Sequence, residues 1–88
     1  MSVSVVIPAL LRTLCGGDNR IEVEGGTLGE VLRNADERCP GLYARIVEDG
    51  RLRPELAIAL NGEVLGLALH EPLEPGAELT IVPAIGGG

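Results

Sequence analysis

The sequence contains no phenylalanine, no tryptophan and no lysine, and Tyr43 is its only aromatic residue. Proteins bind single-stranded nucleic acids through aromatic stacking platforms and basic grooves, and acidic proteins repel phosphate backbones. With one aromatic ring and a formal net charge of -6, the chain offers neither feature, so we expect no nucleic-acid partner. The hydrophobic 45% of the residues is almost entirely aliphatic, which predicts a core of Val, Ile, Leu and Ala.

Because lysine is absent, arginine supplies all seven basic residues. A genome rich in G and C produces this bias without selection, and we take that as the better explanation. A chain without lysine amines would also have little means of attacking its own end if that end were activated as an acyl group. The acidic surface suits a partner with a basic patch, although net charge equally keeps a small protein in solution.

Cysteine is scarce, since Cys15 and Cys39 are the only two and form no C-x-x-C pair. Because no secretory leader precedes them, we expect reduced thiols in a cytoplasmic protein and no disulfide. Together with His70, the only histidine, they match no zinc-ligand spacing, so we expect no metal and no bound cofactor. His70 falls in a predicted loop, where an exposed side chain is expected. No apolar run approaches membrane-spanning length, so we expect no membrane partner.

Apolar residues alternate with polar or small residues in four parts of the chain, as in half-buried strands. The predicted strands lie within residues 3–7, 20–24, 55–67 and 78–82. Asn61-Gly62 divides the third segment into a hairpin, because both residues tolerate the positive φ of a type I′ turn. A turn over residues 15–19 returns the chain between the first two strands.

One main helix is predicted between the second and third of these segments. Thr27-Leu28-Gly29-Glu30 has the spacing of a capping box, in which the threonine oxygen and the glutamate satisfy free amide donors. Apolar residues then recur at helical spacing as far as Ala35, and Pro40-Gly41 ends the helix. A short second helix is predicted over residues 42–47, followed by a turn at residues 48–50.

The order is therefore hairpin, helix, strands and a C-terminal strand. In a compact mixed sheet the last strand would lie beside the first, and a parallel connection requires a crossover that contains the helix. The sequence predicts an α+β protein of the β-grasp, or ubiquitin-like, type, with a mixed sheet of four to five strands and one main helix across it. We expect this domain to cover residues 1–85 and a flexible glycine tail to cover residues 86–88.

The tail is Gly86-Gly87-Gly88, which follows the last predicted strand and Pro83 closely. Glycine has no Cβ, so three in succession form the narrowest and most adaptable tail that a polypeptide can present. Five residues follow Pro83, enough for an extended reach of roughly 17 Å into another protein's active site. A frayed chain end is the alternative. We expect the reactive group to be the terminal carboxylate.

The chain resembles the ubiquitin-like sulfur carriers over nearly its whole length, from residues 3–5 through residues 27–31 to residues 73–88. This family includes the small subunit of molybdopterin synthase, the thiamine-pathway carrier and the carrier used in one route to cysteine. The specific part of the resemblance is a proline-ended strand followed by a terminal glycine pair. Gly76-Ala77-Glu78 departs from the Gly-Asp-Glu of many members. The overall length and residues 48–52 are closer to the molybdopterin and cysteine-route branch.

The resemblance implies that a ubiquitin-activating-type enzyme uses ATP to adenylate the carboxylate of Gly88. Sulfur then replaces AMP, which leaves a thiocarboxylate on Gly88. The resemblance also implies that Gly87, which has no side chain, lets the tail enter a narrow channel of the enzyme. A second partner, a sulfur-accepting biosynthetic enzyme, would take the sulfur. The chain offers no pair of nucleophile and base, so we expect no catalytic residues and a protein co-substrate in place of an enzyme.

Docking on such partners needs a surface beside the tail. Val82 is predicted to face away from the core, and Ala57 and Ala59 would keep that face shallow. Val64, just past the hairpin turn, is predicted to join them. An apolar patch here would bind a partner, although scattered exposed valines are also normal on small proteins.

Sulfur delivery to cysteine, or to another sulfur-containing metabolite such as a thiosugar, is the favoured interpretation. The first alternative is the small subunit of molybdopterin synthase. A ubiquitin-like modifier, conjugated to lysines of target proteins, is an alternative of a different class, because it begins with the same adenylate. The third alternative is a ubiquitin-like interaction domain with an inert tail.

Overall fold

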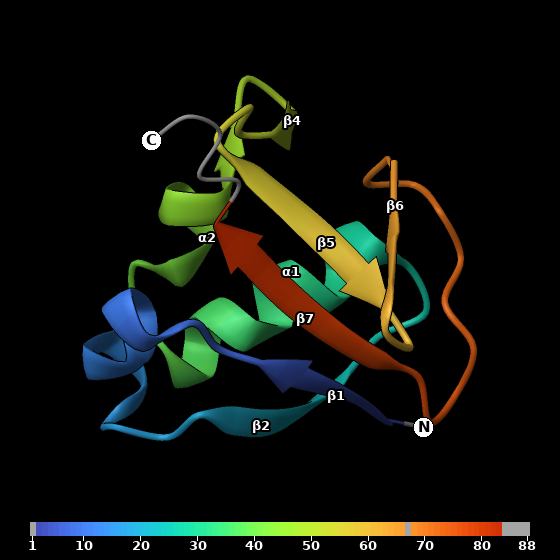
Figure 1. The fold of residues 1–88 in the computed structure, drawn as a ribbon. Helices are drawn as coiled ribbons and strands as arrows, with labels where there is room; N and C mark the ends of the chain where they lie inside the picture. Colours follow the sequence, from blue (N-terminus) through green and yellow to red (C-terminus); the bar gives the residue numbers. More distant parts are fainter. Residues whose placement is uncertain (1, 67, 84–88) are drawn as a thin grey trace.

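The structure is a computed structural model that describes residues 2–66 and 68–83. Its main element is a mixed five-stranded sheet of order β2-β1-β7-β5-β6 (Figure 1). The central strands β1 and β7 run parallel, and the other neighbouring pairs are antiparallel. The sheet strands are β1 (Ser2–Val6), β2 (Arg20–Glu24), β5 (Leu56–Leu60), β6 (Glu63–Leu65) and β7 (Glu78–Pro83). The predicted β-grasp architecture is thus confirmed.

Alternation along the strands gives the sheet one apolar face, because successive strand residues point to opposite sides. Helix α1 (Leu28–Arg38) lies across this face and contributes its own apolar stripe to the same core. The core is wholly aliphatic apart from its two cysteines, as the composition predicts. Its sheet residues, each at most 4% exposed, are Val3, Val5, Ile21, Val23, Ile58, Leu79 and Ile81.

The start of α1 follows from its cap. The Thr27 hydroxyl accepts a hydrogen bond from the Glu30 amide at 3.2 Å. The Glu30 carboxylate accepts from the amide of Gly26 at 2.8 Å, one residue earlier than in a standard capping box. After the predicted stop, α2 (Leu42–Ile46) is joined to α1 by Asp36, whose carboxylate accepts from the amide of Tyr43 at 2.9 Å.

Two local elements depart from the sequence-based expectation. Between β1 and the predicted turn, where the sequence analysis assigns no element, the chain forms a 3-10 helix, η1 (Ala9–Cys15). The Arg12 side chain braces it by donating a hydrogen bond to the Ile7 carbonyl at 2.9 Å. The turn at Asp49-Gly50, with φ of 55° and 77°, closes a small hairpin of β3 (Val47–Glu48) and β4 (Arg51–Leu52). Short 3-10 and two-residue elements carry little periodicity, so the pattern does not reveal them.

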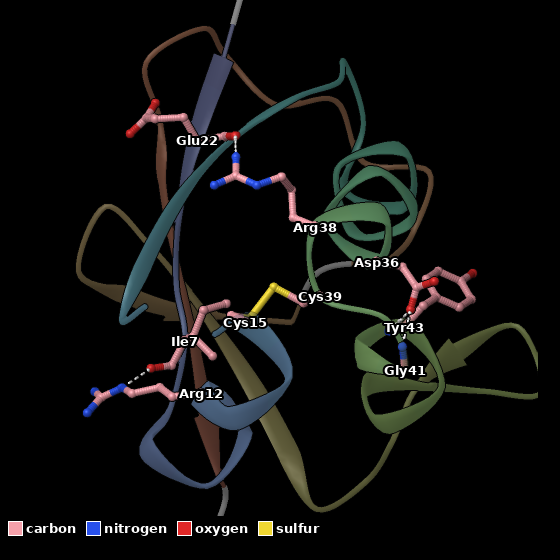
Figure 2. Close-up of a disulfide and its surroundings, with 9 residues drawn as sticks. All are labelled: Ile7, Arg12, Cys15, Glu22, Asp36, Arg38, Cys39, Gly41 and Tyr43. Carbon is pink, nitrogen blue, oxygen red and sulfur yellow. Dashed lines mark hydrogen bonds between the residues drawn. A yellow bond between two sulfur atoms is a disulfide. The ribbon is translucent and has the colours of Figure 1, made fainter. Parts of the chain in front are cut away.

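The expectation of reduced thiols is wrong, because Cys15 and Cys39 form a disulfide (Figure 2). Cys15 ends η1 and Cys39 caps the C-terminus of α1, and their Cα atoms lie 4.4 Å apart. Spacing in the sequence could not show this pairing, since it arises when the connection between β1 and β2 folds against the end of the helix. Among the described residues, no helix combines the length and apolar character needed to cross a membrane.

Candidate functional site

The described chain ends with β7, at one end of the sheet. Val82 pairs with Ala57, and Pro83 pairs with Leu56, the first residue of β5. On its other side β7 pairs in parallel with β1, whose last residue, Val6, lies opposite Thr80. The predicted reactive residues Gly88 and Gly87 and the tail residue Gly86 lie outside the described residues. The last described strand therefore finishes between the end of β1 and the start of β5.

The predicted partner-binding residues share the outer face of the sheet, which is the face turned away from α1. Ala57 and Val82 are direct partners, as are Ala59 and Val64. Their exposure differs: Val64 is 63% exposed, Ala57 and Val82 are half-buried, and Ala59 is only 6% exposed. Three of the four residues can therefore contact a partner, whereas Ala59 forms the floor between them.

The same face contains two residues that the sequence analysis did not single out. Val6 in β1 and Thr80 in β7 are parallel partners, and Thr80 also pairs with Ala59. Val6 has the same strand parity as Ser2 and Ser4, which is the signal for the outer face. The register between β1 and β7 is needed to bring it next to Val82, and no local pattern gives that register.

Away from the tail, the outer face becomes polar. Glu22 in β2 accepts hydrogen bonds from the hydroxyls of Ser2 and Ser4 on β1. Arg20 reaches across β1 to the Glu78 carboxylate at 2.7 Å. The less polar part of the face thus lies over the end of β1, the outer side of β7, β5 and β6. We call it the apolar patch (Val6, Ala57, Val64, Thr80 and Val82).

A pocket of about 450 Å³ lies at the same end of the sheet, and we call it the tail-exit pocket. It brings together the end of β1, the start of β5, and parts of η1, α2 and the segment after β4. Arg53 in this wall donates to the Ala44 carbonyl at 3.2 Å and lies 3.6 Å from the Glu55 carboxylate. Its lining residues are Pro8, Leu10, Leu11, Arg45, Arg53, Glu55 and Leu56.

The remaining candidates for chemistry do not assemble into a site. His70 is exposed, as predicted for a loop residue. Within residues 2–66 and 68–83, histidine, cysteine and acidic side chains form no cluster suited to a metal ion. The two cysteines are bonded to each other and are buried, so neither is available as a thiol nucleophile.

The comparisons of this chain with known proteins agree with one another on its family. The family model described as the ThiS family matches residues 5–88. Sulfur carrier protein CysO of Mycobacterium tuberculosis is 31% identical over 93 residues, covering 100% of both chains. Small archaeal modifier protein 3 of Haloferax volcanii is 33% identical over 67 residues, covering 74% of this chain and 73% of that protein.

A solved structure agrees with the sequence comparison. One chain in the crystal structure of the Amycolatopsis orientalis BexX/CysO complex superimposes with a TM-score of 0.88. The two chains are 35% identical, and the match covers 98% of this chain and 99% of that one. With a family model that spans residues 5–88 and a full-length curated relative, the chain belongs to the ThiS family of ubiquitin-like sulfur carriers.

Proposed function

We propose that this protein carries sulfur as a thiocarboxylate on Gly88. A carboxylate is a poor acyl donor, so a partner enzyme first joins it to AMP from ATP with release of pyrophosphate. A sulfide sulfur then attacks the carbonyl carbon, AMP leaves, and the terminal oxygen is replaced by sulfur. If a persulfide attacks in its place, AMP leaves an acyl disulfide, and a second thiol must reduce its S–S bond to release the thiocarboxylate. The protein acts as a co-substrate in these steps, and the partner enzymes supply the catalytic groups.

The observation that carries this proposal is the position of the strand end. β7 delivers the chain between β1 and β5, beside the apolar patch, and the sequence after Pro83 finishes with three glycines. Such a tail passes through a channel that side chains would block. The rest of the domain remains outside the channel and offers the apolar patch as a docking surface.

Docking on the activating enzyme would use the half-buried Val82 and the exposed Val64 as its apolar contacts. Apolar residues at the centre of an interface contribute most when water is excluded around them. On this face the ionic and hydroxyl contacts of Glu22 and Arg20 lie toward β2, where they form a polar rim. Gly88 would reach the catalytic centre only when the partner covers this patch.

The sulfur is delivered to a biosynthetic enzyme of the cysteine route or of another sulfur-containing metabolite. The full-length likeness to CysO supports the cysteine route over molybdopterin formation. Because activation consumes ATP, the cytoplasm is the compartment that suits the reaction. Disulfides are uncommon in that compartment, and burial of Cys15 and Cys39 protects theirs from exchange with small thiols.

A protein modifier is the second candidate function, and the likeness to small archaeal modifier protein 3 favours it. Both functions begin with the adenylate, and they differ in the group that attacks it. In a modifier a lysine amine of a target protein attacks and forms an amide. In a carrier the attacking group is sulfur, and the protein remains free.

Intact-mass analysis of protein isolated from its native cell separates these functions. A carrier shows a mass increase equal to the exchange of one oxygen for one sulfur, located by fragmentation at Gly88. A modifier is found in amide linkage to other proteins, and after digestion the C-terminal peptide of this chain is joined through Gly88 to target lysines. A terminal residue that stays unmodified under conditions of sulfur demand would overturn both.

A further inference from the structure

The five-stranded sheet ends at β2 on one side and at β6 on the other, and the two edges are protected differently (Figure 1). On the β2 edge, the backbone carbonyl of Glu24 accepts a hydrogen bond from the Asn34 side chain of α1 at 2.8 Å. The carbonyl of Glu22 accepts from the Arg38 side chain of the same helix (Figure 2). A strand from another molecule would have to displace these side chains before it could pair with β2.

The β6 edge has no such cover within the described part of the chain. All three residues of β6 are exposed, and Val64 in the middle is 63% exposed. The segment after β6 forms its hydrogen bonds with the start of α1, where the Leu69 carbonyl accepts from the amide of Gly29 at 2.8 Å. Among residues 2–66 and 68–83, only β5 forms backbone hydrogen bonds with β6.

The hydrogen-bonding phase of β5 follows from its end at the hairpin turn. In an antiparallel pair, opposed residues that exchange two hydrogen bonds alternate with opposed residues that exchange none. The amide of Asn61, just after β5, donates to the Glu78 carbonyl on β7 at 2.8 Å. The odd-numbered residues of β5 therefore bond toward β7, and its even-numbered residues bond toward β6.

This phase leaves the backbone of Val64 without a partner in β5. The even-numbered residues Leu60 and Ile58 bond with the first and last residues of β6. Val64 lies opposite Ala59, whose own amide and carbonyl bond toward β7. The N–H and C=O groups of Val64 therefore point out of the sheet edge, in the position from which they can pair with a further strand.

We propose that an extended segment of the activating enzyme pairs with Val64 and adds a strand to this edge of the sheet. Strand addition takes its affinity from main-chain hydrogen bonds and its specificity from the alternate side chains of the added segment. The inference rests on the proposed function, because it assigns the edge to the enzyme that docks on the apolar patch.

The β6 edge is continuous with the apolar patch. Across the outer face, Thr80 on β7 lies opposite Ala59, and Ala59 lies opposite Val64. An enzyme residue paired with Val64 would extend this row by one position, since directly opposed side chains share a face. Because Val64 is exposed there, the enzyme segment should place a β-branched or aromatic side chain beside it.

Charge distinguishes this occupant from a second copy of the chain. Glu63 is the only charged residue of β6 and has no ion-pair partner among the described residues. Its side chain points to the face opposite that of Val64, where a basic residue of the enzyme segment would reach it. Two copies would each bring a formal net charge of -6, and neither carries a basic residue on β6.

The shortness of β6 limits what the edge contributes. With three residues, it offers one residue whose backbone groups point outward, so the gain in hydrogen bonds is small. Short edges also resist uncontrolled strand pairing. The apolar patch therefore supplies most of the buried area, and pairing at Val64 fixes how the enzyme is rotated on that patch.

Amide hydrogen exchange of the full chain, measured alone and with saturating activating enzyme in the absence of ATP, tests the pairing. In the free chain the Val64 amide should exchange rapidly, and the Leu65 amide, which bonds to Ile58, should exchange slowly. The enzyme should slow exchange at Val64 about tenfold or more. Rapid exchange at Val64 in the saturated complex would refute the pairing.

Two substitutions separate the Val64 amide from its side chain. Val64→Pro removes an N–H that points out of the sheet, so no hydrogen bond to β5 is lost, and proline is tolerated at such edge positions. Val64→Ala keeps the N–H and removes more apolar surface than proline does. A role for the side chain alone therefore predicts the greater loss of affinity in Val64→Ala.

Pairing through the backbone predicts the reverse order. The Kd of Val64→Pro for the activating enzyme should rise about tenfold, because a carbonyl of the enzyme is left buried without a donor, and it should exceed that of Val64→Ala. Melting temperatures check that both variants fold. An equal or greater Kd in Val64→Ala would overturn the proposal, and hydrogen exchange of the parent decides if Val64→Pro does not fold.

Two controls identify the occupant and separate the pairing from the function. Protection of the Val64 amide that grows as the chain alone is concentrated would assign the edge to a second copy and refute the proposal. With ATP and sulfide added, sulfur at Gly88 without protection at Val64 refutes the pairing and supports the carrier function. Protection at Val64 without sulfur at Gly88 supports the pairing and refutes the carrier function.

Discussion

Ala57 and Val82 are direct partners across β5 and β7, one position before the pair of Leu56 and Pro83 with which the described part of β7 ends. Both side chains lie on the outer face, opposite the buried Ile58 and Ile81. The surface that a partner can contact is therefore adjacent to the point from which the tail departs. Because the two are adjacent, a partner that docks on this surface would also hold the start of the tail. The fold is linked to the proposed chemistry in this way.

Replacement of Val82 with Asp should weaken the reaction with the activating enzyme. A carboxylate at the centre of an apolar interface is desolvated without a partner, so we expect kcat/KM for adenylation to fall about tenfold or more. Leu65→Asp is the matched control, because Leu65 is partly exposed on β6 and its register partner, Ile58, faces the core. An equal loss in both variants, or none in Val82→Asp, contradicts a docking role for the apolar patch.

Reduction of the Cys15–Cys39 disulfide should destabilise the protein. The bond closes a loop with a sequence separation of 24, for which the loss of chain entropy in the unfolded state corresponds to about 3.5 kcal/mol. Urea unfolding with and without a reductant measures the difference in the free energy of unfolding. Titration of thiols in the denatured, unreduced protein should find none. Two free thiols in the unreduced protein, together with an unchanged urea midpoint after reduction, would contradict this prediction.

The turn between β2 and α1 offers a matched pair of glycine substitutions. Gly25 has φ of 151°, and a Cβ there would lie 2.7 Å from Cγ2 of Val31, so Gly25→Ala should destabilise the fold by about 2 kcal/mol. At Gly26 the nearest atom to an added Cβ is a carboxylate oxygen of Glu30 at 3.5 Å, and Gly26→Ala should be close to neutral. Thermal unfolding of the two variants compares them directly. Equal melting temperatures would show that the turn adapts.

The elements that were predictable from the sequence are those whose signals are local. Alternation identified the strands, and the spacing of Thr27 and Glu30 located the start of α1, because both depend on neighbours within one turn or one strand. Alternation also placed Val82, Ala57 and Ala59 on the face turned away from the core, since strand parity is readable without the fold. Val64 was added only for its position just past the hairpin turn, and the register of β5 with β6 puts it on the same face. Those positions could be named before their contacts were known.

The features that escaped prediction depend on tertiary contact. The disulfide requires the end of η1 to meet the end of α1, and Cys15 and Cys39 are far apart in the sequence. Val6 joins the apolar patch only through the parallel register of β1 with β7. The tail-exit pocket is assembled from segments between residues 8 and 56, so no single pattern contains it. Each of these features needs the fold before it can be inferred.

The most direct test of the central claim compares the parent with a variant that lacks both Gly87 and Gly88, and therefore no longer ends in a glycine pair. Both are incubated with ATP, sulfide and the activating enzyme, and the intact mass of each is recorded. The account predicts exchange of one oxygen for sulfur at the last residue of the parent and no exchange in the shortened chain, with both proteins showing the same melting temperature. Equal sulfur incorporation in the shortened chain, or sulfur located anywhere other than Gly88 in the parent, would contradict it.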